Sequence, residues 1–422
     1  MRGAIIMTEQ SENAPLKGIK VVDWTQVQSG PSCTQLLAWL GAEVIKIERT
    51  NTGDPTRNEL LDIKDSWSLY YLQLNANKKS LTLDIKTPEG QKITYDLLKK
   101  ADVFVENIRP GAATRAGFGW EKVHELNPRL IMASLKGFNK GSRFANVKAF
   151  EPVAQSAGGA ASATGWNEGD ANIPTQSAAA LGDSNSGMHL TIAILAALLQ
   201  REHTGKGSYV YQSMQDAVIN LCRIKLRDQL MLDNLGALPF YAVYPNYKWG
   251  KAIPRSENSE GGQVIGWTYK AKGWEMDPNA YVYIVIQNKN KSWETIANKM
   301  GHPEWATDER FKDWEHRQLH KQEIYPLIES YTKNYDKYEL TKKLGEAGIP
   351  VGPVLDWHEL ENDPDLNKDG TLVKINQGGN RGEFKTVGMP FTMSNYKPTY
   401  KRAPDLGENN KEILSSLGYD PE

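Results

Sequence analysis

Short segments rich in β-branched residues alternate with amphipathic segments over the first half of the chain. The pattern predicts strands at residues 19–24, 43–48, 103–105 and 129–135, and helices at residues 31–40 and 89–100. This alternation is typical of βαβ units, which form a parallel sheet covered by helices on both faces. We therefore predict an α/β fold with a Rossmann-like parallel sheet, which would bind ligands at the carboxyl ends of its strands.

The second half of the chain has a different pattern. Residues 281–286 have the composition of a strand, and Ile324, Leu327, Ile328 and Tyr331 have helical spacing. These segments predict a second, smaller α/β unit. One long helix is predicted between the two units, at residues 213–235.

The charges of this 422-residue chain are balanced, with 50 Lys and Arg against 51 Asp and Glu. This balance gives no electrostatic footprint for nucleic acid or for an acidic membrane surface. No apolar run approaches the length of a membrane span, and the apolar stretch near Met1 is too short for a secretory signal; Met7 is a second possible start. Cys33 and Cys222 are too few and too far apart for a disulfide framework or a thiolate metal site. We predict a cytoplasmic protein that uses no metal and binds neither nucleic acid nor membrane.

Polar loops follow three of the predicted strands, at residues 25–31, 49–57 and 106–111. They contain neither the GxGxxG turn of dinucleotide-binding folds nor a P-loop. Cations at or beyond the strand ends are Arg49, Lys86, Arg109, Arg115 and Lys148. Together they are suited to clamping the phosphates of a nucleotide-like ligand, although a single cation in such a loop is more often a solvated surface charge.

A single carboxylate, Asp183, lies on a turn flanked by Gly182 and Gly187 and followed by the apolar helix pattern of residues 188–200. Glycine permits close approach of a neighbouring chain or ligand. The turn also contains residues that favour helix N-caps: Ser184, Asn185 and Ser186. A carboxylate beside the free N–H groups of a helix start is either a cap or a nucleophile whose oxyanion those groups stabilise.

Many short motifs in a fixed order resemble the class III coenzyme A transferases of the CaiB/BaiF type. They lie at residues 16–23, 30–31, 40–48, 77–80, 84–86, 105–107, 110–111, 181–183, 205–207, 214–217, 348–350, 352–354 and 403–408. Residues 28–35, 181–190 and 225–229 most resemble the subgroup that uses formyl-CoA and oxalate. The resemblance implies a CoA-transferase that moves CoA from formyl-CoA, or a related acyl-CoA, to oxalate.

The resemblance also implies that Asp183 is the nucleophile, forming aspartyl anhydrides and an aspartyl-CoA thioester. With an ordinary pKa of about 3.9, an aspartate is ionised at neutral pH and needs no general base. Three alternatives stay open: transfer to another acid such as succinate or acetate, an acyl-CoA racemase, and an inactive CoA-binding protein. The racemase is disfavoured because no histidine that could abstract a proton lies between His124 and Asp183.

The remaining site residues are assigned by the same resemblance. Positions matching those that bind coenzyme A are Gln28, Ser29, Arg49, Leu83, Lys86, Asn107, Ile108, Arg109, Arg115, Lys148 and Glu151. The basic residues among them would contact its phosphates. Tyr70 matches a position in the substrate site, although a half-buried core tyrosine would have the same sequence context. Gly261, Gly262 and Gln263 match the end of a glycine loop that covers the nucleophile.

The chain departs from the oxalate subgroup at four positions. Ser259 and Glu260 stand where that subgroup has glycines, so the loop is expected to be stiffer and less favourable to a dicarboxylate. Gln26 and Glu59 stand where it can carry histidine and tryptophan. These changes point to a retuned acceptor site and leave CoA transfer itself in place.

The resemblance finally implies a homodimer of two interlocked chains, each with a large domain built from both ends of the chain. The domains are then 1–215 for the first part of the large CoA-binding domain, 216–240 for a linker, 241–334 for the small domain, 335–360 for a second linker, and 361–422 for the part that returns to the large domain. The partners expected are acyl-CoA, a small carboxylic acid and a second copy of the chain.

Overall fold

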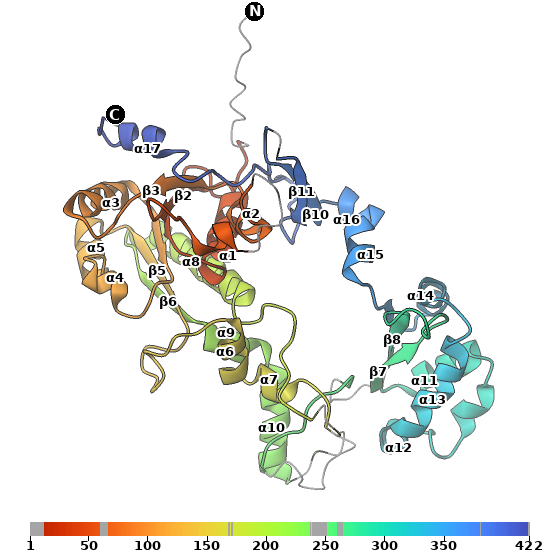
Figure 1. The fold of residues 1–422 in the computed structure, drawn as a ribbon. Helices are drawn as coiled ribbons and strands as arrows, with labels where there is room; N and C mark the ends of the chain where they lie inside the picture. Colours follow the sequence, from red (N-terminus) through yellow and green to blue (C-terminus); the bar gives the residue numbers. More distant parts are fainter. Residues whose placement is uncertain are drawn as a thin grey trace, which may run out of the picture. The chain divides into compact units, whose positions relative to one another are not determined.

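The computed structural model contains two compact units, and the first of them holds a six-stranded sheet (Figure 1). The structure describes residues 12–59, 66–167, 169, 172–236, 238, 251–259, 265–379 and 381–420. The first unit comprises Met1–Gly159, Ser177–Leu221 and Pro364–Glu422, and the second comprises Ala160–Gln176 and Cys222–Asp363. Residues 160–176, placed in the large domain on sequence grounds, thus group with the second unit.

The sheet of the first unit is parallel throughout, in the order β3-β2-β1-β4-β5-β6. Its strands are β1 (Lys20–Trp24), β2 (Glu43–Glu48), β3 (Lys79–Thr82), β4 (Val103–Glu106), β5 (Ile131–Lys136) and β6 (Tyr209–Ser213). The strand order reverses between β1 and β4, so Val21 of β1 has Val44 on one side and Val103 on the other. This reversal is the feature that creates a ligand crevice in doubly wound sheets. The predicted α/β class with a parallel sheet is confirmed; β3 and β6 are two strands that the sequence pattern did not predict.

Both faces of this sheet are covered by helices. Val21 packs with residues of α1 (Ser29–Trp39) and α8 (Ser184–Thr204), while its neighbour Val22 packs with α3 (Pro88–Lys100) and α5 (Trp120–Leu126) on the opposite face. Successive side chains of a strand point to opposite faces, so a strand with two covered faces must be apolar almost continuously. This explains why these strands were visible in the sequence.

The first unit is completed by shorter elements and by the C-terminal part of the chain. They are η1 (Pro55–Asn58), α2 (Leu69–Asn75), α4 (Ala112–Arg115), α6 (Glu151–Ala157), α9 (Met214–Leu221), α16 (Pro364–Lys368), β10 (Leu372–Asn376), β11 (Glu383–Val387) and α17 (Asn410–Ser416). β10 and β11 form an antiparallel hairpin. The C-terminal segment is held to this unit by buried contacts, such as the bond from the Tyr396 hydroxyl to the Trp39 carbonyl and that from Arg57 to the Pro404 carbonyl.

The second unit has its own apolar core around an antiparallel sheet of three strands in the order β7-β8-β9. Its elements are α7 (Ala160–Ala163), α10 (Arg223–Leu235), β7 (Ile265–Lys270), β8 (Tyr281–Ile286), α11 (Asn290–Lys299), η3 (Pro303–Thr307), α12 (Trp314–Leu319), α13 (Lys321–Thr332), α14 (Lys337–Glu346), β9 (Val351–Pro353) and α15 (Trp357–Asn362). The strand predicted at residues 281–286 and the helix predicted around Ile324 are confirmed by β8 and α13.

The single long helix predicted at residues 213–235 is wrong. Ser213 ends β6, where it pairs with Lys136 of β5, and α9 and α10 then follow with a break at Cys222. The boundary between the two units falls at the same place. Apolar residues recur on both sides of the break, so periodicity alone could not reveal it.

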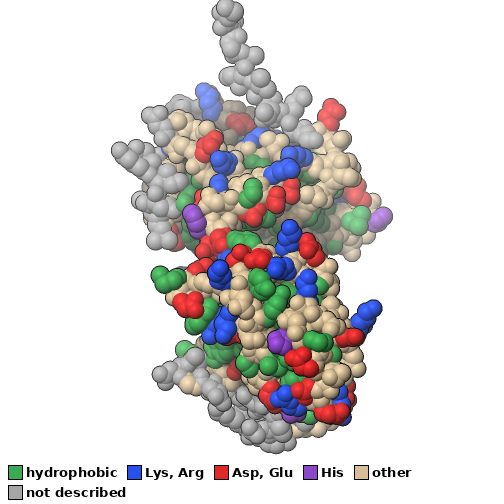
Figure 2. Space-filling view, turned by 90° about the vertical axis from the view of Figure 1, so that its right-hand side faces the viewer, with side chains coloured by type: hydrophobic (Ala, Val, Ile, Leu, Met, Phe, Trp, Pro, Cys, Tyr) green, Lys and Arg blue, Asp and Glu red, His purple; other side chains and the backbone are tan. Residues whose placement is uncertain are grey.

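The surface of the chain carries charges of both signs. Lysine and arginine lie intermixed with aspartate and glutamate on the face shown in Figure 2. Over the described residues, no helix combines the length and the apolar character that crossing a membrane requires. Cys33 is buried and Cys222 is half-buried, and both are free thiols.

Candidate active site

Asp183 lies at the N-terminus of α8, where its carbonyl oxygen accepts the first helical hydrogen bond from the Gly187 N–H (2.9 Å). Its side chain makes no capping hydrogen bond. Two of the residues predicted as caps instead donate their side chains to carbonyls of the preceding turn, Asn185 to Leu181 and Ser186 to Gly182. The Asp183 side chain therefore does not cap the helix, and it makes no hydrogen bond to another of the described residues.

The two glycines of the turn are required by close packing. A Cβ atom on Gly182 would lie 2.6 Å from the Cβ of Ala154 in α6. A Cβ atom on Gly187 would lie 2.8 Å from both the Ser29 carbonyl oxygen and the Ser32 Cβ of α1. The turn is thus wedged between α6 and α1, which fixes the position of Asp183.

Glu151, the first residue of α6, binds the backbone of this turn. Its Oε1 accepts the Gly182 N–H (2.8 Å) and its Oε2 accepts the Asp183 N–H (2.5 Å). Gln155 donates its amide to the same Oε1 (2.8 Å) and to the carbonyls of Ser177 and Ala179. The Asn185 N–H bonds to the Ala180 carbonyl (3.2 Å). Three N–H groups of this turn are thus already engaged, those of Gly182 and Asp183 by Glu151 and that of Asn185 by the Ala180 carbonyl.

The environment of Asp183 disfavours its charged form. Burial, and next the negative charge of Glu151, raise the pKa of Asp183 to about 7. The expectation of an ordinary aspartate is therefore corrected, because this environment favours the neutral carboxyl group well above the pH at which an exposed aspartate ionises. A carboxyl group with a raised pKa in a half-buried site without a capping bond has the character of a reactive group.

Two residues that are distant in the sequence meet beside Asp183. The Tyr70 hydroxyl donates to Gln28 Oε1 (2.8 Å), and Gln28 Nε2 donates to the hydroxyl of Ser184, the next residue after Asp183 (3.0 Å). Burial, and next the charge of Asp183, raise the pKa of Tyr70 to about 12, so the phenol keeps its proton. The first turns of α1, α2 and α8 thus bring a phenol, a carboxamide and a carboxylate together.

A cleft of about 630 Å³ opens at the carboxyl ends of β1, β2 and β4, beside the reversal of strand order. Five of the residues predicted to bind coenzyme A line it: Arg49, Leu83, Lys86, Ile108 and Arg109. The three cations among them are exposed at the cleft. Their position suits an anionic ligand that enters from solvent.

The other predicted residues lie around this cleft or outside it. Asn107 brackets Gln26 of the cleft wall, with Oδ1 accepting the Gln26 N–H (2.9 Å) and Nδ2 donating to the Gln26 carbonyl (2.8 Å). Its Nδ2 also donates to the hydroxyl of Ser29 (3.4 Å), which is buried at the start of α1.

Arg115 on α4 and Lys148 before α6 are exposed and do not line the cleft. Gly261, Gly262, Gln263 and Glu260 lie outside the described residues.

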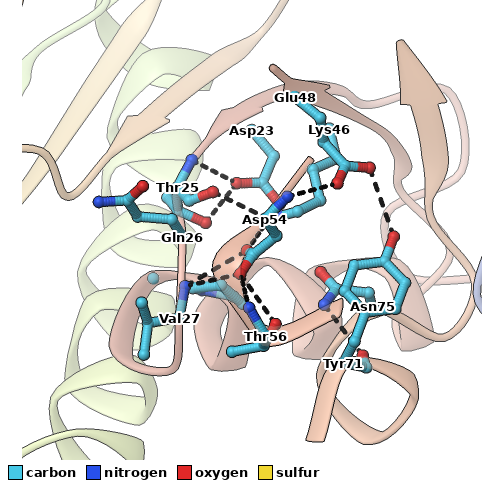
Figure 3. A network of polar contacts seen from close by, with 12 residues as sticks. Asp23, Thr25, Gln26, Val27, Lys46, Glu48, Asp54, Thr56, Tyr71 and Asn75 are labelled. Atoms are coloured by element: carbon cyan, nitrogen blue, oxygen red, sulfur yellow. Dashed lines mark hydrogen bonds and ion pairs between the residues drawn. The ribbon is translucent and has the colours of Figure 1, made fainter. Parts of the chain in front are cut away.

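A buried polar network extends inward from the wall of the cleft, which Lys46, Glu48 and Asp54 line, and the sequence did not predict it (Figure 3). It contains three ion pairs with buried side chains: Lys46–Asp54 (2.9 Å), Arg57–Glu48 (2.6 Å) and Lys78–Asp23 (3.1 Å). Burial alone would raise the pKa of Asp54, but Lys46 and the donors of Thr56 hold this pKa below its usual range. The one available signal was a lysine and a glutamate at positions 46 and 48, inside a strand otherwise typical of a sheet interior.

A further buried ion pair, Lys136–Glu106, shapes the loop after β4. Lys136 of β5 bonds to Glu106 (2.5 Å) and to the Ile108 carbonyl (2.8 Å), and Glu106 Oε2 also accepts the Ile108 N–H (3.1 Å). The loop that presents Ile108 and Arg109 to the cleft is therefore anchored by an ion pair within the sheet.

A family model and the sequences of known proteins both relate this chain to the same family of CoA-transferases. The model of CoA-transferase family III matches residues 16–410. Formyl-CoA:oxalate CoA-transferases of Shigella sonnei and Escherichia coli are each 52% identical to the chain over 407 residues, covering 96% of this chain and 96% of each relative.

Solved structures agree with this result. A CAIB/BAIF family protein from Brucella suis has a TM-score of 0.79 and 27% identity, covering 96% of this chain and 100% of that chain. The protein Rv3272 from Mycobacterium tuberculosis has a TM-score of 0.76 at 24% identity, covering 95% and 99%, and shares the fold.

Proposed function

The chain belongs to CoA-transferase family III, and from this premise we propose that it transfers CoA from formyl-CoA to oxalate, with Asp183 as the nucleophile. The observation that carries the proposal is the Asp183 carboxylate, which has no capping bond and is fixed by Glu151 beside Gln28 and Tyr70. The 52% identity to formyl-CoA:oxalate CoA-transferases supports the choice of donor and acceptor.

The first half of the reaction removes the acyl group from CoA. An Asp183 carboxylate oxygen attacks the thioester carbonyl carbon, the C–S bond breaks, and the CoA thiolate leaves a formyl-aspartyl anhydride behind. The thiolate then attacks the aspartyl carbonyl carbon, which releases formate and forms an aspartyl-CoA thioester. The covalent route divides one difficult exchange into steps between activated acyl groups.

The second half reverses these steps with the acceptor acid. An oxalate oxygen attacks the aspartyl thioester, which expels the CoA thiolate and forms an aspartyl-oxalyl anhydride. The thiolate attacks the oxalyl carbonyl carbon, which gives oxalyl-CoA and restores Asp183. No proton has to be abstracted from carbon at any step, so a histidine base is not needed.

We assign the stabilisation of the oxyanions to Gln28 and Tyr70. The backbone N–H groups of Gly182 and Asp183 are bonded to Glu151 and that of Asn185 to the Ala180 carbonyl, whereas the Gln28 carboxamide and the Tyr70 hydroxyl bond only to each other and to Ser184 among the described residues. A small rotation of either side chain would direct a donor at a tetrahedral intermediate on Asp183.

We assign coenzyme A to the cleft next to this site. Arg49, Lys86 and Arg109 are exposed there and would bind its phosphates, while Leu83 and Ile108 supply apolar surface. Gln26 belongs to the cleft wall, and Gln28 follows two residues later beside Asp183. A ligand that runs from the cleft along this turn would bring its thiol end toward the carboxylate.

A different acceptor is the second candidate, and one observation favours it. Burial and the charge of Asp183 are the largest causes of the raised pKa of Tyr70, and the charge of Glu59 adds to them. Glu59 is thus a further carboxylate, besides Asp183 and Glu151, in the electrostatic surroundings of the site. A dicarboxylate would be repelled more strongly there than a monocarboxylate such as acetate.

We further propose that the active form is a homodimer, with the two chains interlocked. One side of α8 leaves the apolar side chains Met188, Ile192 and Leu199 between 44% and 65% exposed, at helical spacings of four and seven residues. An apolar stripe of this kind on a soluble enzyme is typical of a surface covered by another subunit. Labelled dimers that exchange subunits without denaturant would contradict interlocking.

The function is tested by a panel of substrates on the purified protein. Formyl-CoA, oxalyl-CoA and succinyl-CoA are offered as donors against formate, oxalate, succinate and acetate, with acyl-CoA products separated by chromatography. We expect the highest kcat/KM with formyl-CoA and oxalate. Preference for acetate would support the second candidate, and the absence of transfer with every pair would exclude both.

The nucleophile is tested by chemical trapping. Hydroxylamine added during turnover is expected to convert the aspartyl intermediates into a hydroxamate that mass spectrometry locates at residue 183. Asp183→Ala should abolish transfer and retain CoA binding. Full activity of this variant would exclude the proposed mechanism.

A further inference from the structure

The backbone between β1 and α1 turns sharply at residues 25–27, and side chains bind each of five successive polar backbone groups of this turn. Asp23 Oδ1 accepts the Thr25 N–H (3.0 Å), Lys46 Nζ donates to the Thr25 carbonyl (2.8 Å), and Asn107 binds both Gln26 groups. The Val27 N–H donates to both carboxylate oxygens of Asp54 (3.3 Å each). The turn is therefore held from outside rather than by its own hydrogen bonds.

Val27 adopts a backbone conformation that its side chain disfavours. Its φ is +66°, in the left-handed region that glycine enters freely and a β-branched residue does not. Such a conformation persists only when its surroundings enforce it, and it occurs preferentially at functional sites. The next residue is Gln28, so the direction in which Gln28 leaves the turn depends on this conformation.

Asp54 is the residue that reaches the strained position. Its buried carboxylate also accepts the Thr56 N–H (3.0 Å) and hydroxyl (2.8 Å) and pairs with Lys46, so it cannot swing away (Figure 3). Lys46 in turn holds the Thr25 carbonyl. The Lys46–Asp54 pair thus binds the first residue of the turn, Thr25, and its last, Val27.

The position of the Gln28 side chain depends on this turn, because its carboxamide must at once accept a hydrogen bond from Tyr70 and donate one to Ser184. A shift of about 1 Å at a positioned group can cost about 100-fold in rate. We propose that Asp54, together with Lys46, is a positioning residue for CoA transfer: it enforces the left-handed conformation of Val27 and so aims Gln28 at the reacting centre beside Asp183. This inference rests on the proposed function.

A double-mutant cycle tests the proposal. Asp54→Asn is made in the wild-type background and in the Gln28→Ala background, and kcat, KM for formyl-CoA and thermal unfolding are measured for all four proteins. Because Asp54 acts through Gln28, we expect Asp54→Asn to lower kcat about 10- to 100-fold in the first background and less than about threefold in the second. Ser80→Ala is the control, since Ser80 donates to Glu48 in the same buried network without contacting the turn. It should lower stability and change kcat less than about twofold.

The alternative outcome is clear. Equal losses of kcat from Asp54→Asn in both backgrounds would mean a general structural role and would overturn the proposal. If Asp54→Asn does not fold because Lys46 is left unpaired, the cycle is run with Asp54→Asn/Lys46→Gln, which removes both charges together. A wild-type protein without transfer activity would refute the proposed function instead, so the two failures are distinguishable.

The backbone strain gives a second measurement. In the Asp54→Asn protein, Val27→Gly should restore part of kcat, because glycine adopts φ +66° without help, whereas Val27→Ala should not. Equal behaviour of the glycine and alanine variants would contradict the role given to the Val27 conformation.

Discussion

Glu151 binds the backbone of the turn that carries Asp183 with both carboxylate oxygens, and the Asp183 N–H donates to one of them at 2.5 Å. One carboxylate thus fixes the position of a second carboxylate and at the same time disfavours its charge. The position and the pKa of Asp183 are consequently coupled.

The pH dependence of the first half-reaction should follow the ionisation of Asp183. Only the carboxylate attacks a thioester, and burial with the Glu151 charge raises the pKa of Asp183 to about 7. We expect kcat/KM for formyl-CoA to rise with pH through a midpoint near 7 and then to level off. Stopped-time assays between pH 5 and 9 measure this, and a flat profile from pH 5 upward would show an ordinary aspartate.

Asp183→Asn should stabilise the protein at alkaline pH. The folded pKa lies above the unfolded value, so the folded state binds the extra proton, and the contribution of Asp183 to stability is lost as pH rises from about 4 through 7. The neutral amide avoids this loss. We expect the free energy of unfolding in urea to increase by about 1–3 kcal/mol at pH 8 and by roughly a third of that amount at pH 5. The same difference at both pH values would refute this linkage.

Glu151→Gln should change both the pH midpoint and the rate. An amide removes the charge that raises the Asp183 pKa and offers one acceptor oxygen for two N–H groups. We expect the midpoint of the pH profile to move down while staying above the ordinary aspartate value, because burial is the larger cause, and kcat to fall about 10-fold or more. Glu125→Gln, on the exposed side of α5, is the control and should leave both unchanged.

Gly182→Ala should impair the reaction through packing alone. The new methyl group would lie 2.6 Å from the Ala154 Cβ, so the turn must move. We expect kcat to fall about 100-fold and the free energy of unfolding to decrease by about 1–3 kcal/mol. Gly141→Ala, where a Cβ meets nothing within 4 Å, provides the matched control. Normal turnover of the Gly182 variant would show that the turn tolerates displacement.

Arg109→Gln should weaken the binding of acyl-CoA without affecting the chemical steps. Arg109 is exposed at the cleft and is not bonded to the Asp183 turn. We expect KM for formyl-CoA to rise about 5- to 10-fold at unchanged kcat, which corresponds to the loss of one charge-assisted contact with a phosphate. Lys122→Gln on α5 should leave KM unchanged. A loss of kcat at constant KM would contradict this role and would indicate that Arg109 acts on the chemical steps.

The sequence predicted those parts of the molecule that depend on local pattern. β1, β2, β4 and β5 were visible because both of their faces are buried, and the turn at Asp183 was visible because of its glycines. The resemblance then supplied Gln28 and Tyr70, whose meeting beside Asp183 no spacing could reveal.

The rest depends on contacts between distant segments. Glu151 lies 32 residues before Asp183, and only the docking of α6 under the turn makes it a support. Lys46 stood out as a charge in a strand, but its partner Asp54 follows in the next loop and reads there as a common turn residue. The break at Cys222 occurs because the chain leaves one unit for the other, which an uninterrupted apolar pattern does not report.

The buried network behind the wall of the cleft pairs three acids with three bases, Asp23, Glu48 and Asp54 with Lys46, Arg57 and Lys78. Burial lowers the pKa of Lys78 to about 8, so near pH 7 Lys78 still holds its proton and the three pairs carry no net charge. Among the described residues that line the cleft, the cations left to attract a phosphorylated substrate are therefore the exposed Arg49, Lys86 and Arg109, whose charges dissolved ions screen within about 10 Å at 0.1 M salt. Affinity for acyl-CoA should consequently decline with ionic strength, while the compensated interior keeps its shape.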